Sequence, residues 1–154
     1  MYAKILVPVD GSDTADRGLQ EAIAMATKLD AKLLLLHVID PYPMIGGVEY
    51  ASAAAWRECN ESVRASGKRV LEAAHTAAVA AGVAVEDRLD DSGASRVADV
   101  ITETARAQNC DLIVMGTHGR RGFSHLAMGS DAERVARQSP VPLLLVRRAD
   151  GDAR

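Results

Sequence analysis

Leu33-Leu34-Leu35-Leu36-His37-Val38-Ile39 indicates the fold class of this chain most directly. A strand with one side in water alternates apolar and polar residues, whereas this run is apolar at nearly every position. Such a run is typical of a central strand in a parallel sheet that helices cover on both faces. We therefore predict a buried parallel strand here. His37, inside the run, is predicted to be a core histidine with a satisfied hydrogen bond rather than a ligand or a base.

The rest of the chain alternates between strand patterns and helix patterns. Apolar runs predict further strands at residues 5–9, 83–89, 112–115 and 143–146, of which 83–89 alternates most and is expected nearer the edge of the sheet. Apolar residues at helical spacing predict helices over residues 14–29 and 53–81, another around residues 97–105, and one from about Asp131. This alternation indicates an α/β fold with a parallel sheet and right-handed connections.

Size and composition restrict the architecture and the partners. The chain has 154 residues, which favours a single domain, predicted over residues 1–148 with a frayed tail at residues 149–154. Aromatic residues make up only 3% of the chain and the formal net charge is −3. Both values argue against base-stacking platforms and against a large basic surface for nucleic acid.

The cysteines and the N-terminal sequence indicate the compartment. Cys59 and Cys110 are far apart and lack the spacing of metal ligands, so we expect buried free thiols in a reducing compartment. The N-terminal residues do not have the pattern of a secretory leader, and no apolar run approaches the length of a membrane span. A cytoplasmic protein with no membrane contact is predicted.

The loops that follow the strands carry the candidate site, because ligands of open α/β sheets bind beyond the carboxyl ends of the strands. Gly116 and Gly119 frame a turn directly after a buried strand, where backbone N–H groups can approach an anion. Gly129-Ser130 opens the next helix, whose free N–H groups and dipole favour a phosphate. Arg120 lies between these two segments and is suited to neutralise phosphate charge.

A purely structural role explains the same residues. Gly116 would then only end a strand, and Ser130-Asp131-Ala132-Glu133 matches the helix-capping pattern S-x-x-E. Asp10, at the end of the first strand, either belongs to an ordinary turn or accepts hydrogen bonds from ribose hydroxyls. Because Ser12 and Asp13 can cap the following helix, we expect Asp10 to be partly free of structural duty.

Known catalytic motifs are missing from the sequence. It contains no G-x-x-x-x-G-K-[ST], no G-x-G-x-x-G, no G-x-S-x-G and no H-E-x-x-H. No nucleophile and general base can be placed together, so neither a catalytic residue nor a set of metal ligands is assigned.

Taken together, these motifs resemble the universal stress proteins, small α/β domains related to the adenine nucleotide alpha-hydrolase fold. The nucleotide-binding members carry G-x-x-G, nine residues, and then G-[ST]. Here Gly116-x-x-Gly119 is followed by residues 120–128 and then by Gly129-Ser130. The opening residues 5–12, the stretch 111–116 and the closing residues 140–147 also match, so the resemblance covers nearly the whole chain.

The resemblance implies a three-layer, Rossmann-like sandwich with a five-stranded parallel sheet in the order 3-2-1-4-5, and ATP with Mg²⁺ over the carboxyl ends of strands one and four. The residues assigned to the nucleotide, by the resemblance and in the case of Arg120 by its charge, are Pro8, Val9, Asp10, Val38, Met115, Gly116, Gly119, Arg120, Gly129 and Ser130. Asp131 departs from the family pattern, in which the residue after the Ser is often small or apolar. Its carboxylate would repel a triphosphate, an effect that the helix N-terminus and bound Mg²⁺ would soften.

Three functional hypotheses remain open at this point. The first is an ATP-binding sensor or regulator of the stress response, with at most slow hydrolysis. The second is an adenine-nucleotide-dependent enzyme of the same fold, which the absence of S-G-G-x-D-S and H-x-G-H patterns disfavours. The third is a nucleotide-free interaction module with a structural glycine loop.

The last strand predicts a homodimer. Pro140 and Pro142 indicate an edge strand, because proline cannot donate to a ladder. Residues 143–146 would leave an apolar edge exposed, and symmetric pairing of two copies would cover both edges at once.

Overall fold

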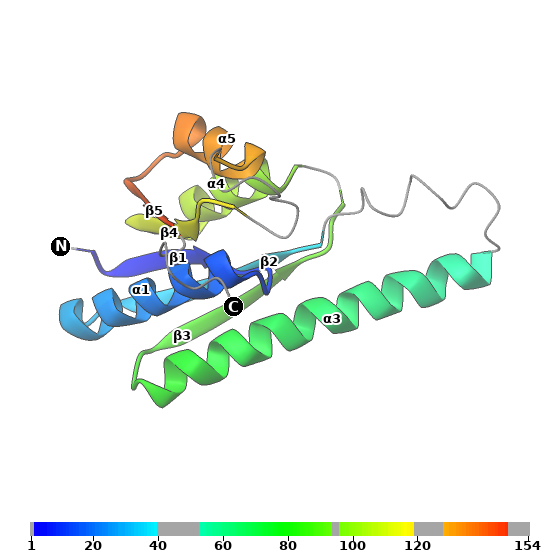
Figure 1. Ribbon diagram of the computed structural model, residues 1–154, viewed down its shortest axis with the longest axis horizontal. Coiled ribbons are helices and arrows are strands. Elements are labelled where there is room, and N and C mark those ends of the chain that lie inside the picture. The colour runs from blue at the N-terminus through cyan, green and yellow to red at the C-terminus, as the bar shows by residue number, and fades with distance from the viewer. Residues whose placement is uncertain (1, 40–52, 94–95, 119–127, 148–154) are drawn as a thin grey trace.

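Five parallel strands form one sheet in the order β3-β2-β1-β4-β5 (Figure 1). The coordinates are a computed structural model, which describes residues 2–39, 53–93, 96–118 and 128–147. In chain order the elements are β1 (Lys4–Pro8), α1 (Asp13–Leu29), β2 (Lys32–Val38), α3 (Ala53–Ala80), β3 (Val85–Asp90), α4 (Val97–Ala107), β4 (Leu112–Gly116), α5 (Ser130–Gln138) and β5 (Leu143–Val146). This order confirms the predicted α/β fold and the strand order that the resemblance implied.

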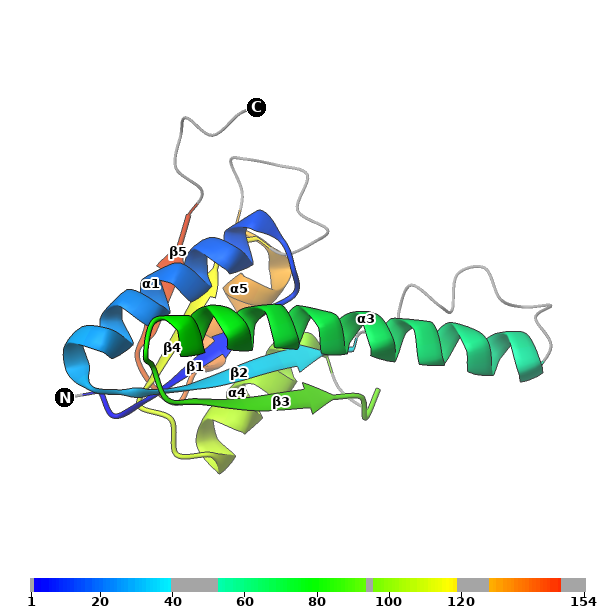
Figure 2. The same cartoon turned by 90° about the horizontal axis from the view of Figure 1, so that it is seen from below.

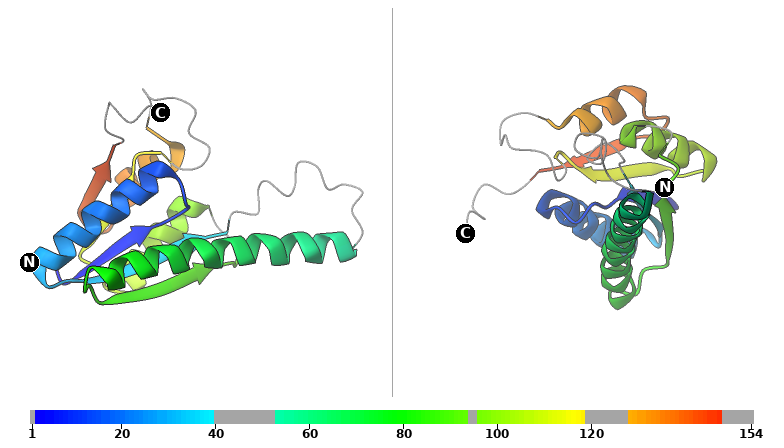
Figure 3. Two further views of the ribbon diagram at one scale, coloured as in Figure 1. Left: turned by 60° about the horizontal axis from the view of Figure 1, so that its bottom comes forward. Right: turned by 90° about the vertical axis from the view of Figure 1, so that its right-hand side faces the viewer.

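Helices cover both faces of the sheet, so the molecule has three layers. Figure 2 shows α1 and α3 on one face, and Figure 3 shows α4 and α5 on the other. Alternate residues of β2 serve the two faces: Leu33 and Leu35 belong to the core under α1 and α3, whereas Leu34 and Leu36 belong to the core under α4 and α5. Because both faces are buried, the strand is apolar throughout, as the sequence predicted.

Two sequence predictions, the place of β3 in the sheet and the end of α3, agree with the structure. β3 lies at an edge of the sheet, as its alternating sequence indicated. α3 ends at Ala80, and Gly82 follows with φ at +74°, a backbone conformation that glycine adopts without strain.

None of the helices in the described part of the chain has the length and apolar content needed to span a bilayer.

α3 extends well beyond the sheet that it covers (Figure 1). Its buried residues begin at Gly67 and recur at helical spacing to Ala78, whereas residues 57–62 are exposed. Cys59 lies in this exposed part, so the prediction of a buried thiol is wrong for Cys59 and confirmed for Cys110. An Ala-rich helix pattern does not reveal where a helix outgrows its sheet, because its composition is the same on both sides of that point.

Asp111 ties the start of β4 to the start of β1. Its Oδ2 accepts hydrogen bonds from the backbone N–H groups of Ala3 (2.8 Å) and Lys4 (2.9 Å). These two bonds hold the pKa of the Asp111 carboxyl below its ordinary value. The clasp lies at the end of the β1–β4 pair opposite the candidate site, and it helps to keep the two strands in register.

Asp111→Asn is expected to lower the free energy of unfolding at neutral pH, by an amount that shrinks on acidification. A carboxyl whose pKa is lower in the folded chain stabilises the fold above its unfolded pKa, about 3.9, and loses that contribution as the pH falls through the folded value. Urea unfolding of wild type and variant from about pH 7 down to about pH 3 measures the difference. Glu21→Gln, which removes an exposed carboxylate from α1, is the control. A difference independent of pH would contradict the role given to the carboxylate.

Candidate functional site

The candidate site lies where the strand order of the sheet reverses. β1 and β4 are neighbours in the sheet, and the helices that follow them cover opposite faces, α1 one and α5 the other. Ligands of open α/β sheets bind in the crevice outside the carboxyl ends of the strands at such a reversal. The predicted site residues at this end of the sheet are Pro8, Val9 and Asp10 at the end of β1, Val38 at the end of β2, and Met115 and Gly116 at the end of β4.

Asp10 shapes the turn between β1 and α1. Its Oδ1 accepts a hydrogen bond from the backbone N–H of Ser12 at 2.9 Å. The Ser12 hydroxyl in turn accepts from the N–H of Ala15 at 3.2 Å and caps α1, as predicted. Asp10 therefore has a structural role in this turn, in addition to the capping by Ser12 that the sequence predicted.

Gly116 allows α1 to approach the end of β4 closely. A Cβ at this position would lie 2.7 Å from both the carbonyl carbon and the carbonyl oxygen of Thr14, and 3.0 Å from the backbone nitrogen of Ala15. Gly18, further along α1, faces the same strand end, since a Cβ there would lie 3.2 Å from the Gly116 nitrogen. Backbone atoms cannot move aside as side chains do, so residue 116 must be glycine whatever ligand the site takes.

Two threonines link the segments that surround the site. The Thr14 hydroxyl donates a hydrogen bond to the carbonyl of His118 at 2.6 Å, between residues 104 positions apart in the sequence. The N–H of Thr117 donates to the carbonyl of Val146, and the carbonyl of Thr117 accepts from the N–H of Gly129, both at 2.9 Å. The start of α1, the end of β4 and the approach to α5 are therefore held together.

The sequence did not indicate these roles for Thr14 and Thr117. Both are buried, which is uncommon for threonine at the ends of elements. The only signal in the sequence is their position. Thr117 comes immediately after a strand, and Thr14 lies in the first turn of the helix that follows a strand-end loop. Many ordinary helix starts share that position, so it could not have distinguished these two residues.

α5 begins at Ser130, with Gly129 as its N-cap. The alternative that Ser130 to Glu133 forms a capping box is wrong, because Ser130 is already inside the helix and no side chain caps it. The N–H of Glu133 donates to the carbonyl of Gly129 at 2.9 Å, so the helical N–H groups before it have no acceptor within the helix. Such a helix start favours an anion. Gly119 and Arg120, the other predicted phosphate contacts, lie outside the described residues.

Carboxylates make the start of α1 electrically negative. Partial burial and then the carboxylates of Asp13 and Asp10 raise the pKa of the Asp16 carboxyl above its ordinary value. Within the residues that the structure describes, no three His, Cys, Asp or Glu side chains gather so that they could hold a metal ion. An anionic ligand near Asp10 therefore depends for charge balance on the start of α5 and on any cation that it brings along.

The family of the chain follows from comparison with known proteins. The model of the universal stress protein family matches residues 1–147. The chain belongs to that family. A universal stress protein of Thermus aquaticus is 37% identical over 149 residues, which cover 96% of this chain and 100% of that protein.

Solved universal stress protein structures share the fold. The chain superimposes on the protein MJ0577 of Methanocaldococcus jannaschii with a TM-score of 0.84 at 29% identity, covering 98% of this chain and 99% of that one. Against a universal stress protein solved in complex with cAMP, the TM-score is 0.66 at 26% identity, with 95% and 97% covered. The resemblance noted in the sequence is confirmed.

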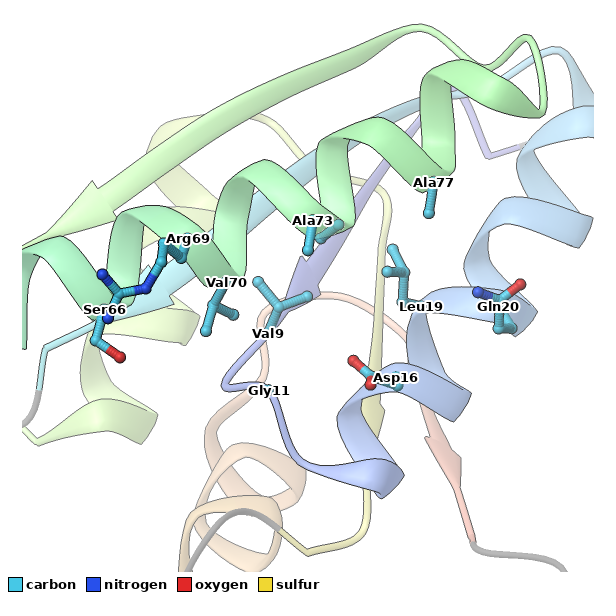
Figure 4. Close-up of a pocket in the computed structure, with 11 residues that line it drawn as sticks. Val9, Gly11, Asp16, Leu19, Gln20, Ser66, Arg69, Val70, Ala73 and Ala77 are labelled. Atoms are coloured by element: carbon cyan, nitrogen blue, oxygen red, sulfur yellow. The ribbon is translucent and has the colours of Figure 1, made fainter.

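In this universal stress protein, a groove of about 420 Å³ lies between α1 and α3, next to the turn that carries Asp10 (Figure 4). Val9 and Gly11, the neighbours of Asp10 in the chain, line the groove on one side, and Val70 of α3 lines it on the other. A Cβ at Gly11 would lie 3.2 Å from Cγ2 of Val70, so α3 touches the turn directly. The turn is thus held from the side of α3 as well as from β4.

Proposed function

We propose that this universal stress protein binds an adenine nucleotide, ATP with Mg²⁺, at the carboxyl ends of β1 and β4, and that it acts as a sensor or regulator in the stress response. The observation that carries the proposal is the junction of three segments at the strand reversal. Hydrogen bonds of Thr14 and Thr117 tie together the start of α1, which follows the Asp10 turn, the end of β4 and the start of α5. A carboxylate and a helix N-terminus at one switch point match the two ends of a nucleotide, a ribose and a phosphate.

Each part of the nucleotide has candidate partners in this arrangement. Adenine and ribose are expected against Pro8, Val9, Asp10 and Val38, with the Asp10 carboxylate accepting a hydrogen bond from a ribose hydroxyl. Ribose and phosphates are expected against Met115, Gly116, Gly119, Gly129 and Ser130, with Arg120 available to the phosphates. Mg²⁺ would arrive bound to the phosphates, since it is usually held by few protein ligands and by substrate phosphates.

The comparisons support this assignment of ligand class. The relative solved with cAMP is a universal stress protein, and the match to it spans nearly the whole of both chains. Because cAMP contains the adenine and ribose groups of ATP, the site proposed for those groups is supported more directly than the one for a triphosphate.

We also propose that the protein is a homodimer through β5. The carbonyls of Pro142 and Val146 accept hydrogen bonds from Ile113 of β4 and from Thr117, which follows β4. By the alternation of a strand, the backbone groups of Leu143 and Leu145 therefore point to the outer edge of the sheet. Leu144 is 37% exposed there. A second copy of the strand would satisfy these backbone groups and cover the leucine.

A cytoplasmic location fits the thiol chemistry. Cys59 and Cys110 are both free, one exposed and one buried, and free cysteines of this kind are usual in a reducing compartment.

Calorimetric titration of the protein with MgATP, AMP and cAMP tests the nucleotide proposal. We expect saturable binding, and Asp10→Ala is expected to weaken it by about 1–3 kcal/mol, or about 5-fold to 150-fold, which is the cost of losing hydrogen bonds to a charged acceptor. Asp16→Ala removes the same charge from α1 without touching a residue assigned to the nucleotide, so its affinity is expected to stay level or rise slightly.

A second variant separates binding from the structural duty of Asp10. Asp10→Asn keeps an oxygen that can accept from Ser12, and it should therefore preserve the turn while removing the charge. Urea unfolding of each variant reports the turn, and calorimetry reports the ligand. Absence of binding by the folded wild type, together with no nucleotide retained in native mass spectrometry, would favour a nucleotide-free interaction module instead.

A further inference from the structure

His37 holds the residue that precedes Asp10. The histidine is 5% exposed, as expected for a core residue, and its Nδ1 lies 2.8 Å from the carbonyl oxygen of Val9. A carbonyl oxygen only accepts hydrogen bonds, so Nδ1 carries the proton and donates it. The N–H of Val9 donates to the carbonyl of Leu36 at 2.8 Å. Both backbone polar groups of Val9 are thus held from β2.

The ring of His37 is in turn held by α3. A Cβ at Gly67 would lie 2.7 Å from Cδ2 and 3.0 Å from Nε2 of His37, so the edge of the imidazole rests directly on the helix backbone. Glycine in the interior of a helix costs about 1 kcal/mol relative to alanine. The contact with His37 gives a physical reason for glycine at this position, because a larger residue would push the ring away from Val9.

The next turn of α3 touches the other side of the same loop. Val70 lies against Gly11, whose φ is +77°, and Figure 4 shows Val70 beside Val9 and Gly11 in the groove. Residues 67 and 70 of α3 therefore act on both chain neighbours of Asp10, on Val9 through His37 and on Gly11 directly. Asp10 thus lies between two residues, Val9 and Gly11, whose positions depend on contacts with α3.

We infer that His37 is a positioning residue for the nucleotide site, which transmits the position of α3 to the Asp10 turn. The inference rests on the proposed function, because its measurable consequence is nucleotide affinity. The Nδ1–H bond to Val9 sets where the backbone leaves β1, and hence where the Asp10 carboxylate lies relative to the end of β4. His37 itself needs no contact with the nucleotide.

Two substitutions at His37 separate positioning from packing. His37→Leu keeps an apolar side chain of similar length and removes the donor, whereas His37→Asn keeps an N–H donor close to the place of Nδ1. We expect MgATP affinity, measured by calorimetry well below the unfolding temperature, to fall about tenfold in His37→Leu and to be largely restored in His37→Asn. Unfolding of both variants is followed in parallel. His75→Leu, at a partly exposed histidine of α3 paired with Asp87, is the matched control and should bind as the wild type does.

Gly67→Ala tests the link to α3 without changing His37. The added Cβ should displace the ring, so this variant is expected to lose affinity as His37→Leu does, and the double variant should lose little more than either single one. The imidazole N–H resonance of His37 in nitrogen-15 spectra should shift in Gly67→Ala, and it should shift in the wild type when nucleotide is added.

The outcomes separate this inference from the proposed function. Unchanged affinity in folded His37→Leu, or an equal loss in His37→Leu and His37→Asn, would overturn the positioning role while leaving nucleotide binding in place. If His37→Leu does not fold, unchanged affinity in Gly67→Ala has the same meaning. Failure of the wild type to bind any adenine nucleotide would overturn the proposed function and this inference with it.

Discussion

Gly116→Ala is expected to lower the free energy of unfolding by about 3 kcal/mol, and the unfolding midpoint by about 6–12 °C. The added Cβ would lie 2.7 Å from backbone atoms of Thr14, so the start of α1 must move away from β4. That movement breaks the contact that brings the Asp10 turn next to the end of β4. Thermal unfolding followed by circular dichroism measures the loss of stability. Calorimetry with MgATP is expected to show that the molecules that remain folded bind the nucleotide more weakly than the wild type does.

Gly82→Ala is the matched control for this substitution. A Cβ at Gly82 meets nothing within 4 Å, so the variant has only the strain of a positive φ, about 1–2 kcal/mol. The difference between the two glycine variants therefore measures the close contact between α1 and β4. Equal stability of the two variants would mean that α1 does not approach β4 as closely in solution as in the structure.

Leu144→Lys is expected to convert the proposed dimer into a folded monomer. At the outer edge of β5 the lysine would place a charge in the apolar contact between two copies, and two such charges would meet because a symmetric interface repeats every residue. In the monomer the lysine lies at the edge of the sheet and reaches water, so the fold should survive. Light scattering coupled to size-exclusion chromatography at micromolar concentration measures the mass, and circular dichroism checks the fold.

Val79→Lys is the control for the dimer. Val79 is the most exposed of the large apolar residues on the described surface, at 54%, and it lies on α3, away from β5. This variant should keep the mass of the wild type. A monomeric wild type, or a Leu144→Lys variant that stays dimeric, would rule out pairing through β5.

Much of the fold was predictable because it depends on local patterns. The run from Leu33 to His37 is buried on both faces of the sheet, and burial on both faces is what removes the alternation of apolar and polar residues from the sequence. Gly82 follows the end of α3 because a left-handed backbone after a helix favours glycine. Gly116 was predicted to follow a buried strand and Gly129-Ser130 to open a helix, and the structure has them at the end of β4 and at the start of α5.

The details of the site were not predictable in the same way. Ser130 matched a capping box, yet the helix begins one residue earlier than that pattern requires, because its start is set by the bond from Gly129 to Thr117. Cys59 was predicted to be a buried thiol, yet it is exposed, because α3 extends beyond the sheet at this residue. In both cases the local pattern correctly predicted a helix, but it carried no information about the segments that pack against that helix.

Local patterns in the sequence were enough to predict which segments are strands and helices, that the sheet is parallel with buried central strands, and which loops lie at the carboxyl ends of the strands. These properties follow from periodicity and from the turn residues, which act over a few positions. Three contacts appear only in the folded chain: the hydrogen bond from Thr14 to His118, the close approach of α1 to Gly116, and the placement of His37 between Gly67 and Val9. Such contacts join residues far apart in the chain, and they depend on distances of a few tenths of an ångström between packed elements, which no local pattern encodes.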